Sequence, residues 1–591
     1  MLYGLMTEEI NFSYDGGLYP ELVRDRAIGP GRRPLFHWTM VARGNSVVDV
    51  AVDDKTGPSV ALPRSLKVSV TSATEATPAG VQNDGFWGIP VRPQTIYAGS
   101  FYAKTDSAGV PVTVSIVNDE TGAIAATADI NGLTGDWAQY TFTLKTAQVS
   151  PSANNHLVLT IPRPATVWFD LVSLFPPTYQ GRPHGNRIDL MEMLAAMHPK
   201  FLRLPGGNYL EGDHIPERYE WKKTIGPWVD RPTHPSPWRY RSSDGMGLLE
   251  FMEWCEDLKI EPVLAVYAGY SMAQEHVDSG PALEPYIQDA LDEIEYVTGD
   301  ASTKWGAERV KNGHAAPFPL HYVEIGNEDW FDRSGSYDGR YAQYYKEIKA
   351  RHPDLQLIAT APIKGLKPDV LDEHFYMSAE KSFSDVTHYD KTDRNGPKIF
   401  VGEWATREGE PTPNLQAALG DAAWMTGMER NSDIVIMSSY APLFVNVNPG
   451  GMQWESDLIG YDALTSYGSP SYWAQVLFAS HLGTEVLGST LSDTGPRVYS
   501  SVTRDEKRRK LFIKVVNGNS DKLPLIIAIN GVPTVGRQAT LTTLSGKTPG
   551  ATNTITNPKA IVPVEHKLVI TGPRFEREFA PYSINVIDLS Y

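Results

Sequence analysis

The sequence has little cysteine and few of the motifs typical of a bound metal or cofactor. Cys255 is the one cysteine among 591 residues, so no disulfide can form within the chain. Its spacing within Gly247–Cys255 predicts a thiol buried on a helix. No cysteine pair, His-Glu-x-x-His helix, acidic calcium loop, phosphate-binding glycine loop or Gly-x-Ser-x-Gly elbow occurs. We therefore predict no metal site, no cofactor and no serine esterase chemistry.

Long apolar runs and clusters of positive charge are also lacking. No stretch approaches the ~18 consecutive apolar residues needed to span a membrane, so we expect no membrane association. The net charge is −17, from 70 acidic and 53 basic residues, and no block is rich in Lys and Arg. Because this field repels a polyanion, we expect no nucleic-acid partner, whereas a neutral polysaccharide is compatible with it.

The overall composition is typical of a globular protein with several hydrophobic cores. Hydrophobic residues make up 41% and charged residues 21%, and the length leads us to expect three domains. Residues 45–175 contain short alternating runs rich in Val, Thr and Ser, such as Leu66–Val70 and Val112–Val117. This pattern predicts an inserted β-sandwich. Residues 485–591 have the same character, for example at Lys510–Val516, and predict a C-terminal β-sandwich.

Between these two regions, residues 180–480 alternate short apolar runs with helical patterns. The candidate strands are Phe201–Leu204, Pro262–Val266, Tyr322–Ile325, Leu355–Thr360, Val370–Phe375, Ile399–Gly402 and Ile434–Ser438. An eighth strand is Leu2–Asn11, so that residues 1–40 form the first barrel strand and its connection. Eight such units close a (β/α)8 TIM barrel of the α/β class, with the sandwich inserted between its first and second units.

Two glutamates follow apolar strands, at the end where such barrels carry catalytic residues. Glu328 ends the run Tyr322–Glu328, and Glu403 follows Ile399–Gly402. About 75 residues separate them, or three βα units of about 25 residues, which places them on facing strands. Two carboxylates flanking one bond are what glycoside hydrolysis requires. A single glutamate after a strand is commonly a rim residue or ion-pair partner, but the repeated context favours catalysis.

Further polar residues occur close to these strand ends. Asn327 directly precedes the first glutamate, where its amide is suited to bond a sugar 2-hydroxyl. Arg203 ends another strand, and a buried guanidinium there would keep a neighbouring carboxylate ionised. Gly206 and Gly207 permit a tight turn that directs Asn208 toward the pocket. An ordinary Pro-Gly-Gly turn is the alternative interpretation.

Two other barrel strands supply candidates. His374 and Tyr376 end the sixth strand, where either side chain is placed to orient the nucleophile by a hydrogen bond. A purely structural histidine is the alternative. Glu8 lies near the end of the first strand, where it is suited to accept hydrogen bonds from sugar hydroxyls.

At these positions the sequence resembles the family 51 glycoside hydrolases, the α-L-arabinofuranosidases, and especially their fungal branch. The resemblance covers nearly the whole chain and includes both glutamate contexts. The matching motifs are Tyr3–Asn11, Asp15–Tyr19, Glu21–Ala27, Arg203–Asn208, Ile325–Glu328, Glu373–Tyr376 and Gly402–Ala405.

The resemblance implies a role for each of these residues. Glu328 corresponds to the general acid/base and Glu403 to the nucleophile of a retaining, exo-acting α-L-arabinofuranosidase. Residues at family positions that contact the arabinose are Glu8, Asn208, Asn327 and Tyr376. The inserted sandwich is similar to a carbohydrate-binding module, and the C-terminal one to a jelly roll. The substrate implied is a plant cell-wall polysaccharide such as arabinoxylan or arabinan, or an arabino-oligosaccharide. We expect an extracellular protein whose leader is missing from this chain.

Two other functions remain open at this point. One is an endo-β-1,4-glucanase or xylanase on the same fold, which needs an open cleft rather than a pocket. The other is a carbohydrate-binding protein without catalysis, which would not need both glutamates.

Overall fold

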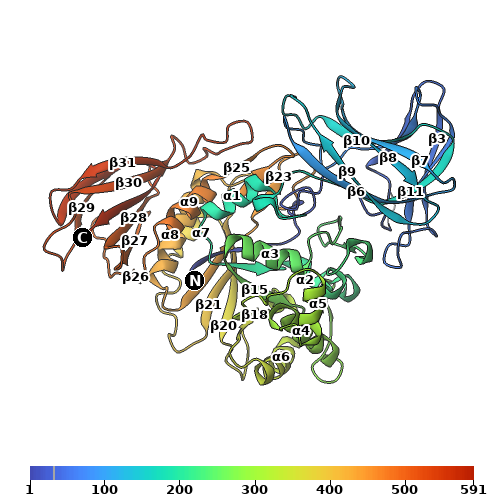
Figure 1. Ribbon diagram of the computed structural model, residues 1–591. Helices are drawn as coiled ribbons and strands as arrows, with labels where there is room; N and C mark the ends of the chain where they lie inside the picture. Colours follow the sequence, from blue (N-terminus) through green and yellow to red (C-terminus); the bar gives the residue numbers. More distant parts are fainter. Residues whose placement is uncertain (31–33) are drawn as a thin grey trace.

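A closed barrel of eight parallel strands forms the centre of the computed structural model, which describes residues 1–30 and 34–591 (Figure 1). The strands follow one another around the barrel in chain order, and the last pairs with the first. They are β1 (Tyr3–Met6), β12 (Phe201–Leu204), β15 (Glu261–Val266), β18 (Tyr322–Ile325), β19 (Gln356–Ala359), β20 (Val370–Met377), β21 (Lys398–Thr406) and β22 (Val435–Tyr440). The predicted TIM barrel is therefore confirmed.

Helices cover the outside of this barrel. The principal ones are α1 (Ile188–Ala196), α3 (Leu248–Leu258), α4 (Glu284–Thr298), α5 (Lys304–Lys311), α6 (Tyr337–Arg351), α7 (Ala379–Ser384), α8 (Leu415–Arg430) and α9 (Pro470–Ser480). Cys255 is buried on α3, as its spacing predicted. No helix within residues 1–30 and 34–591 is long and apolar enough to cross a membrane.

The opening strand is shorter than predicted. It ends at Met6 rather than Asn11. Asn11 and Phe12 have φ angles of 56° and 60°, in the left-handed region that a strand does not use. The strand therefore ends before these residues, and the chain leaves the barrel sheet after Met6. Strand β20, in contrast, continues past the predicted Phe375 to Met377.

The barrel interior is layered. A lower apolar layer contains Phe201, Val370 and four further buried residues. Side chains two residues apart share one face of a strand, so Arg203 and Asp372 lie directly above this layer. Both are buried. The interior therefore changes from apolar to charged toward the strand ends.

Short sheets in the loops at those strand ends surround the opening of the barrel. They consist of β13 (His234–Pro235) with β14 (Arg241–Ser242), β16 (Tyr270–Ser271) with β17 (Glu275–His276), and β23 (Phe444–Asn446), β24 (Ile459–Tyr461) and β25 (Ser466–Gly468). A single helical turn, α2 (Asn208–Glu211), follows β12.

Two five-stranded sheets form the inserted sandwich, which lies at one end of the molecule (Figure 1). One contains β2 (Trp38–Ala42), β5 (Ala79–Asn83), β10 (Asn155–Ile161), β7 (Val110–Asn118) and β8 (Ile124–Leu133). The other contains β3 (Val47–Asp53), β4 (Ser65–Ser72), β11 (Ala165–Phe175), β6 (Ile96–Thr105) and β9 (Ala138–Lys145). Strand β6 alternates between buried and more exposed positions, as a sheet with one face on a core should. The first strand of this sandwich, β2, begins at Trp38, whereas the sandwich was predicted to begin at residue 45.

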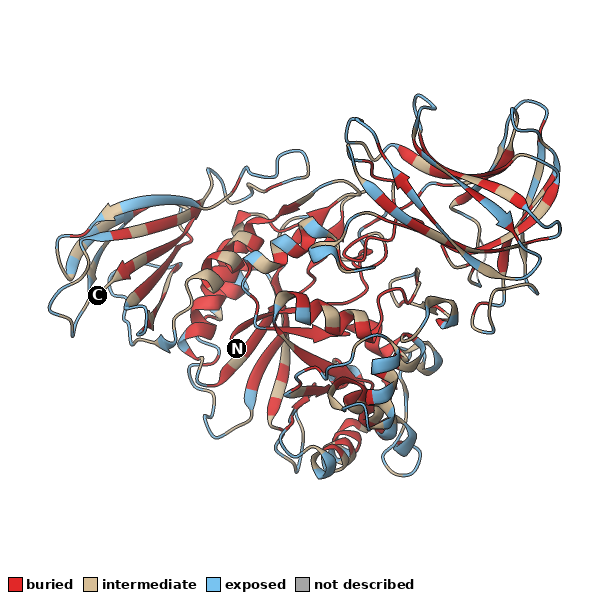
Figure 2. Ribbon diagram, in the orientation of Figure 1, coloured by how far each residue is buried: buried red, intermediate tan, exposed pale blue. Residues whose placement is uncertain are grey.

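The C-terminal β-rich domain lies at the opposite end (Figure 1). Its larger sheet contains β26 (Glu485–Val486), β27 (Val498–Asp505), β28 (Lys510–Asn517), β33 (Ser583–Ser590), β30 (Gln538–Ser545) and β31 (Val564–Val569), and its smaller sheet β29 (Leu523–Ala528) and β32 (Arg574–Phe579). Helix α8 packs between the barrel and this domain and is buried on nearly all sides (Figure 2). There Glu429 of α8 forms a buried ion pair with Lys514 of β28.

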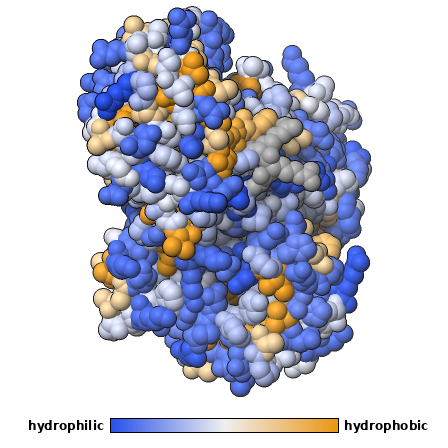
Figure 3. Space-filling view, turned by 90° about the vertical axis from the view of Figure 1, so that its right-hand side faces the viewer, coloured by the Kyte–Doolittle hydropathy of each residue, from blue (hydrophilic) through white to orange (hydrophobic). Residues whose placement is uncertain are grey.

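The surface differs in character from these cores. Figure 3 shows a face that is mostly hydrophilic, with apolar side chains in small separate groups. Such scattered groups are usual for a protein surface.

Candidate active site

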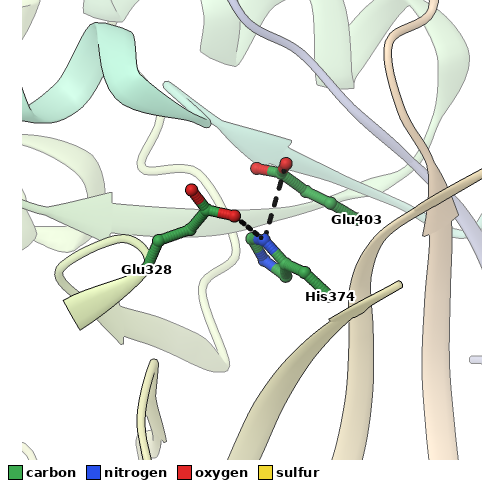
Figure 4. Close-up of side chains that lie close together, drawn as sticks. All are labelled: Glu328, His374 and Glu403. Atoms are coloured by element: carbon green, nitrogen blue, oxygen red, sulfur yellow. Dashed lines mark hydrogen bonds and ion pairs between the residues drawn. The ribbon is translucent and has the colours of Figure 1, made fainter. Parts of the chain in front are cut away.

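The two glutamates predicted to act together lie in one cavity at the carboxyl ends of the barrel strands. Glu328 follows β18, and Glu403 lies on β21. Three atoms lie within 4.8 Å of one another: one carboxylate oxygen of each glutamate and a ring nitrogen of His374 (Figure 4). Carboxylates about 5–5.5 Å apart are found in retaining glycosidases. The structure thus brings together the pair that the strand-end pattern selected.

Arg203 connects several of the acidic and polar groups below this cavity. Its guanidinium donates from Nη1 to Glu403 Oε1 at 2.7 Å and from Nη2 to Asn327 Oδ1 at 2.8 Å. Its Nε donates to Glu324. The side chain is fully buried, so these directional bonds hold the planar guanidinium in one orientation.

Glu403 is surrounded by groups that favour its ionised form. Tyr376 donates its hydroxyl to Oε2 at 2.7 Å, and His374 Nδ1 lies 3.5 Å from the same oxygen. Burial acts to raise the pKa of Glu403, but the charges of His374 and Arg203 and the hydrogen bonds from Tyr376 and Arg203 outweigh it, so the pKa is lowered. An ionised carboxylate is what nucleophilic attack requires.

His374 lies between three carboxylates. Its Nδ1 donates to Glu328 Oε1 at 2.8 Å (Figure 4). Its Nε2 donates to Asp372 Oδ2 at 2.7 Å. Burial lowers the pKa of this imidazole, yet the charges of Glu403 and Asp372 raise it well above its ordinary value. An imidazolium has no lone pair for a metal ion, so this cluster is suited to hydrogen bonding rather than to metal binding.

A chain of side chains extends from Arg203 to the cavity. Asn327 Nδ2 and Asn208 Nδ2 both donate to Glu211 Oε2, each at 2.8 Å. Asn327 is almost fully buried behind the cavity wall, whereas Asn208 and Glu211 line the cavity. Sequence reasoning missed Glu211, although it follows Asn208 by three residues on one helical turn, a spacing at which side chains meet.

The cavity itself has a volume of about 470 Å³. Its polar lining consists of Glu8, Asn208, Glu211, Gln274, Glu328, Tyr376 and Glu403. Its apolar lining includes Trp238, Tyr270, Met272, Phe331 and Trp454. A few convergent polar groups within an apolar wall are typical of a small-ligand site.

Comparisons with known proteins identify the family of the chain. A model of the α-L-arabinofuranosidase 1 domain matches residues 193–394, and one of the α-L-arabinofuranosidase C-terminal domain matches residues 388–583. Over its whole length the chain is 33% identical to α-L-arabinofuranosidase 2 of Arabidopsis thaliana, of which it covers 88%. It is 34% identical to α-L-arabinofuranosidase A of Aspergillus kawachii, over 99% of this chain and 93% of that protein.

A solved structure gives the family number. An arabinose-bound GH51 α-L-arabinofuranosidase matches with a TM-score of 0.93 and 37% identity, over 100% of this chain and 97% of that one. The chain belongs to family 51 of the glycoside hydrolases, the α-L-arabinofuranosidases. The resemblance carried by the motifs is thereby confirmed, and this family 51 member is a glycoside hydrolase that acts on arabinofuranosyl residues.

Glu8 of this α-L-arabinofuranosidase family member is held in an unusual environment. Its Oε1 accepts a hydrogen bond from Trp238 Nε1 at 2.7 Å. Burial first, and then the charge of Glu403, raise the pKa of Glu8 from 4.5 to about 8. At neutral pH the carboxyl group therefore carries a proton and is able to donate a hydrogen bond into the cavity.

This pKa predicts a pH-dependent effect of Glu8→Gln on stability. Between pH 4.5 and about 8 the unfolded chain loses the Glu8 proton while the folded chain keeps it, so rising pH destabilises the fold. Glutamine is neutral in both states and removes this loss. We expect the Tm of Glu8→Gln, relative to that of the unmodified protein, to rise steadily from pH 5 to pH 8 in thermal melts.

The matched control is Glu192→Gln, at an exposed position on α1. Its Tm difference should not follow the same trend. A Tm difference for Glu8→Gln that stays constant over this pH range would show that Glu8 ionises alike in both states.

Proposed function

We propose that this protein is a retaining, exo-acting α-L-arabinofuranosidase that removes terminal arabinofuranosyl residues from arabinoxylan, arabinan or derived oligosaccharides. The observation that carries the proposal is that an ionised glutamate lies close to a second glutamate in one cavity. Glu403 is kept ionised by Arg203, His374 and Tyr376, and an oxygen of Glu328 lies within 4.8 Å of it. That spacing matches the short separation of a retaining pair, about 5–5.5 Å, and not the roughly 6.5–9.5 Å of an inverting pair.

In the first step a Glu403 oxygen attacks the anomeric carbon while the bond from that carbon to the leaving oxygen breaks. Glu328 gives its proton to the leaving oxygen, and a covalent arabinosyl ester of Glu403 forms. His374 already donates to Glu328 Oε1, so the transferable proton belongs on Oε2.

In the second step Glu328, now a carboxylate, takes a proton from water. The water oxygen bonds to the anomeric carbon, the ester bond breaks, and Glu403 is released as a carboxylate. Two displacements on one carbon retain its configuration.

The cavity wall supports exo action. Trp238 and Trp454 come from different loops and pack edge to face, with their ring centroids 6.2 Å apart. Both rings line the cavity, and Trp238 donates to Glu8, so the pair forms part of the cavity wall beside Glu8. A wall on this side suits a pocket that takes a terminal residue better than a cleft through which a polysaccharide chain passes. This favours an exo-hydrolase over an endoglucanase or xylanase.

The experiment that tests both claims uses two substrates. With an aryl α-L-arabinofuranoside, proton NMR of the first product should show the α-anomer before mutarotation. With linear arabinan, free arabinose should appear from the start while viscosity changes slowly. Early β-anomer would contradict retention. A rapid fall in viscosity of arabinan, xylan or a β-1,4-glucan would instead favour the endo-acting alternative.

A further inference from the structure

The inserted sandwich contacts the barrel beside a loop that forms part of the cavity wall. This loop, residues 447–458, connects β23 to β24 and carries Trp454. On the sandwich side Trp87 lies in the turn after β5 and donates from Nε1 to the carbonyl oxygen of Pro449 at 3.1 Å. The bond therefore joins the sandwich to the beginning of the wall loop.

Trp87 is itself held firmly. Its ring meets the Phe12 ring edge to face, with centroids 5.1 Å apart. The Arg24 guanidinium lies 4.7 Å from the Trp87 ring centroid and 4.8 Å from that of Phe12. An indole packed between a ring and a cation has few alternative rotamers, so its N–H is a fixed donor.

The barrel holds the same loop near its other end. Asn11 Oδ1 accepts from the backbone N–H groups of Gln453 at 2.6 Å and Trp454 at 2.9 Å, and Asn11 Nδ2 donates to the Trp454 carbonyl at 3.1 Å. Between the two attachments lie Gly450 and Gly451, and Gly450 has a φ of 82°. Glycines have large backbone freedom, so a loop attached at one end alone would sample more conformations.

A displacement of Trp454 would affect the proposed nucleophile, Glu403, through Tyr376. The Trp454 ring packs edge to face on Tyr376, with centroids 5.8 Å apart, and the Tyr376 hydroxyl bonds Glu403 Oε2. A displaced indole would change both the wall around the sugar and the packing behind this hydroxyl.

We propose that the inserted sandwich positions the Trp454 wall of the active site, with Trp87 as the positioning residue that acts through Pro449. This inference rests on the proposed arabinofuranosidase function. It assigns the insertion a role in the reaction of small substrates, which a module that only binds polysaccharide would not have.

The test is a double-mutant cycle on an aryl arabinofuranoside, with Trp87→Phe and Trp454→Ala made singly and together. Phenylalanine keeps the ring contacts but removes the indole N–H. We expect Trp87→Phe to lower kcat/KM about three- to tenfold, as loss of one positioning hydrogen bond does. In the Trp454→Ala background the same change should have almost no further effect. Additive effects in the cycle would overturn the proposal.

The matched control is Trp168→Phe. Trp168 is also in the inserted sandwich, but its Nε1 bonds Asp53 of the same domain at 2.9 Å. Trp168→Phe should leave kcat/KM unchanged with the aryl substrate. An equal loss in both tryptophan variants would show a general effect on the sandwich and contradict a specific role for Trp87.

A readout without substrate separates this inference from the proposed function. In protein labelled with 5-fluorotryptophan, the fluorine resonance of Trp454 is assigned by its absence in Trp454→Phe. It should shift or broaden in Trp87→Phe and stay unchanged in Trp168→Phe. An unchanged resonance in Trp87→Phe would overturn the positioning role, whatever the substrate proves to be.

Discussion

Glu403→Ala is expected to abolish turnover of an aryl α-L-arabinofuranoside, with a loss in kcat on the order of 10⁵-fold. Alanine removes the carboxylate that attacks the anomeric carbon and takes one of their partners from Arg203 and His374. The space it vacates admits a small anion. Added azide should therefore restore turnover and give an arabinosyl azide of inverted configuration, since one displacement replaces two.

The control for this variant is Glu373→Gln. Glu373 lies on the neighbouring strand β20, but its carboxylate accepts a bond from Tyr389 at 2.8 Å and does not line the cavity. This variant should keep most of its activity. Full activity of Glu403→Ala, or azide rescue with retained configuration, would end the assignment of Glu403 as nucleophile.

Glu328→Gln should have an effect that depends on the leaving group. Glutamine keeps the bond from His374 Nδ1 but cannot donate an acidic proton or accept one from water. For arabino-oligosaccharides, whose alkoxide leaving group needs the proton, we expect kcat/KM to fall about 10²–10⁴-fold. For a dinitrophenyl arabinofuranoside kcat/KM should change little.

The second step also slows in Glu328→Gln, because water loses its base. Rapid mixing with the dinitrophenyl substrate should show a burst equal to the enzyme concentration, followed by slow turnover and a lowered KM. An equal loss with both leaving groups would show that Glu328 acts by binding and not by proton transfer. Activated and natural substrates measured side by side supply the control within one variant.

Much of the fold was accessible from sequence patterns. Apolar runs alternating with helical periods predicted seven strands of the barrel close to where they lie, because buried parallel strands have short, strongly apolar sequences. The opening strand was predicted too long. The residues after Met6 are buried like strand residues, and periodicity does not reveal the left-handed conformation of Asn11 and Phe12.

Part of the site could also be predicted from the sequence, because some of its residues occupy positions that a local pattern reveals. Glu328 and Glu403 each follow an apolar run, so their position at a strand end is a local property. Glu211 was missed because its importance comes from contacts with Asn208 and Asn327, the second of which is 116 residues away. Trp454 was missed because it lies in a loop with no periodic pattern.

The sequence by itself determined which residues lie at the ends of the barrel strands, because the hydrophobic periods of strands and helices are local properties of the sequence. It also determined the family, through short motifs around those ends. Only the tertiary structure decided which side chains meet: His374 with three carboxylates, Arg203 with both Asn327 and Glu403, and Trp87 with the loop of Trp454. The physical reason is barrel closure and domain packing. They bring together groups that are tens to hundreds of residues apart, and no local pattern records the distance between them.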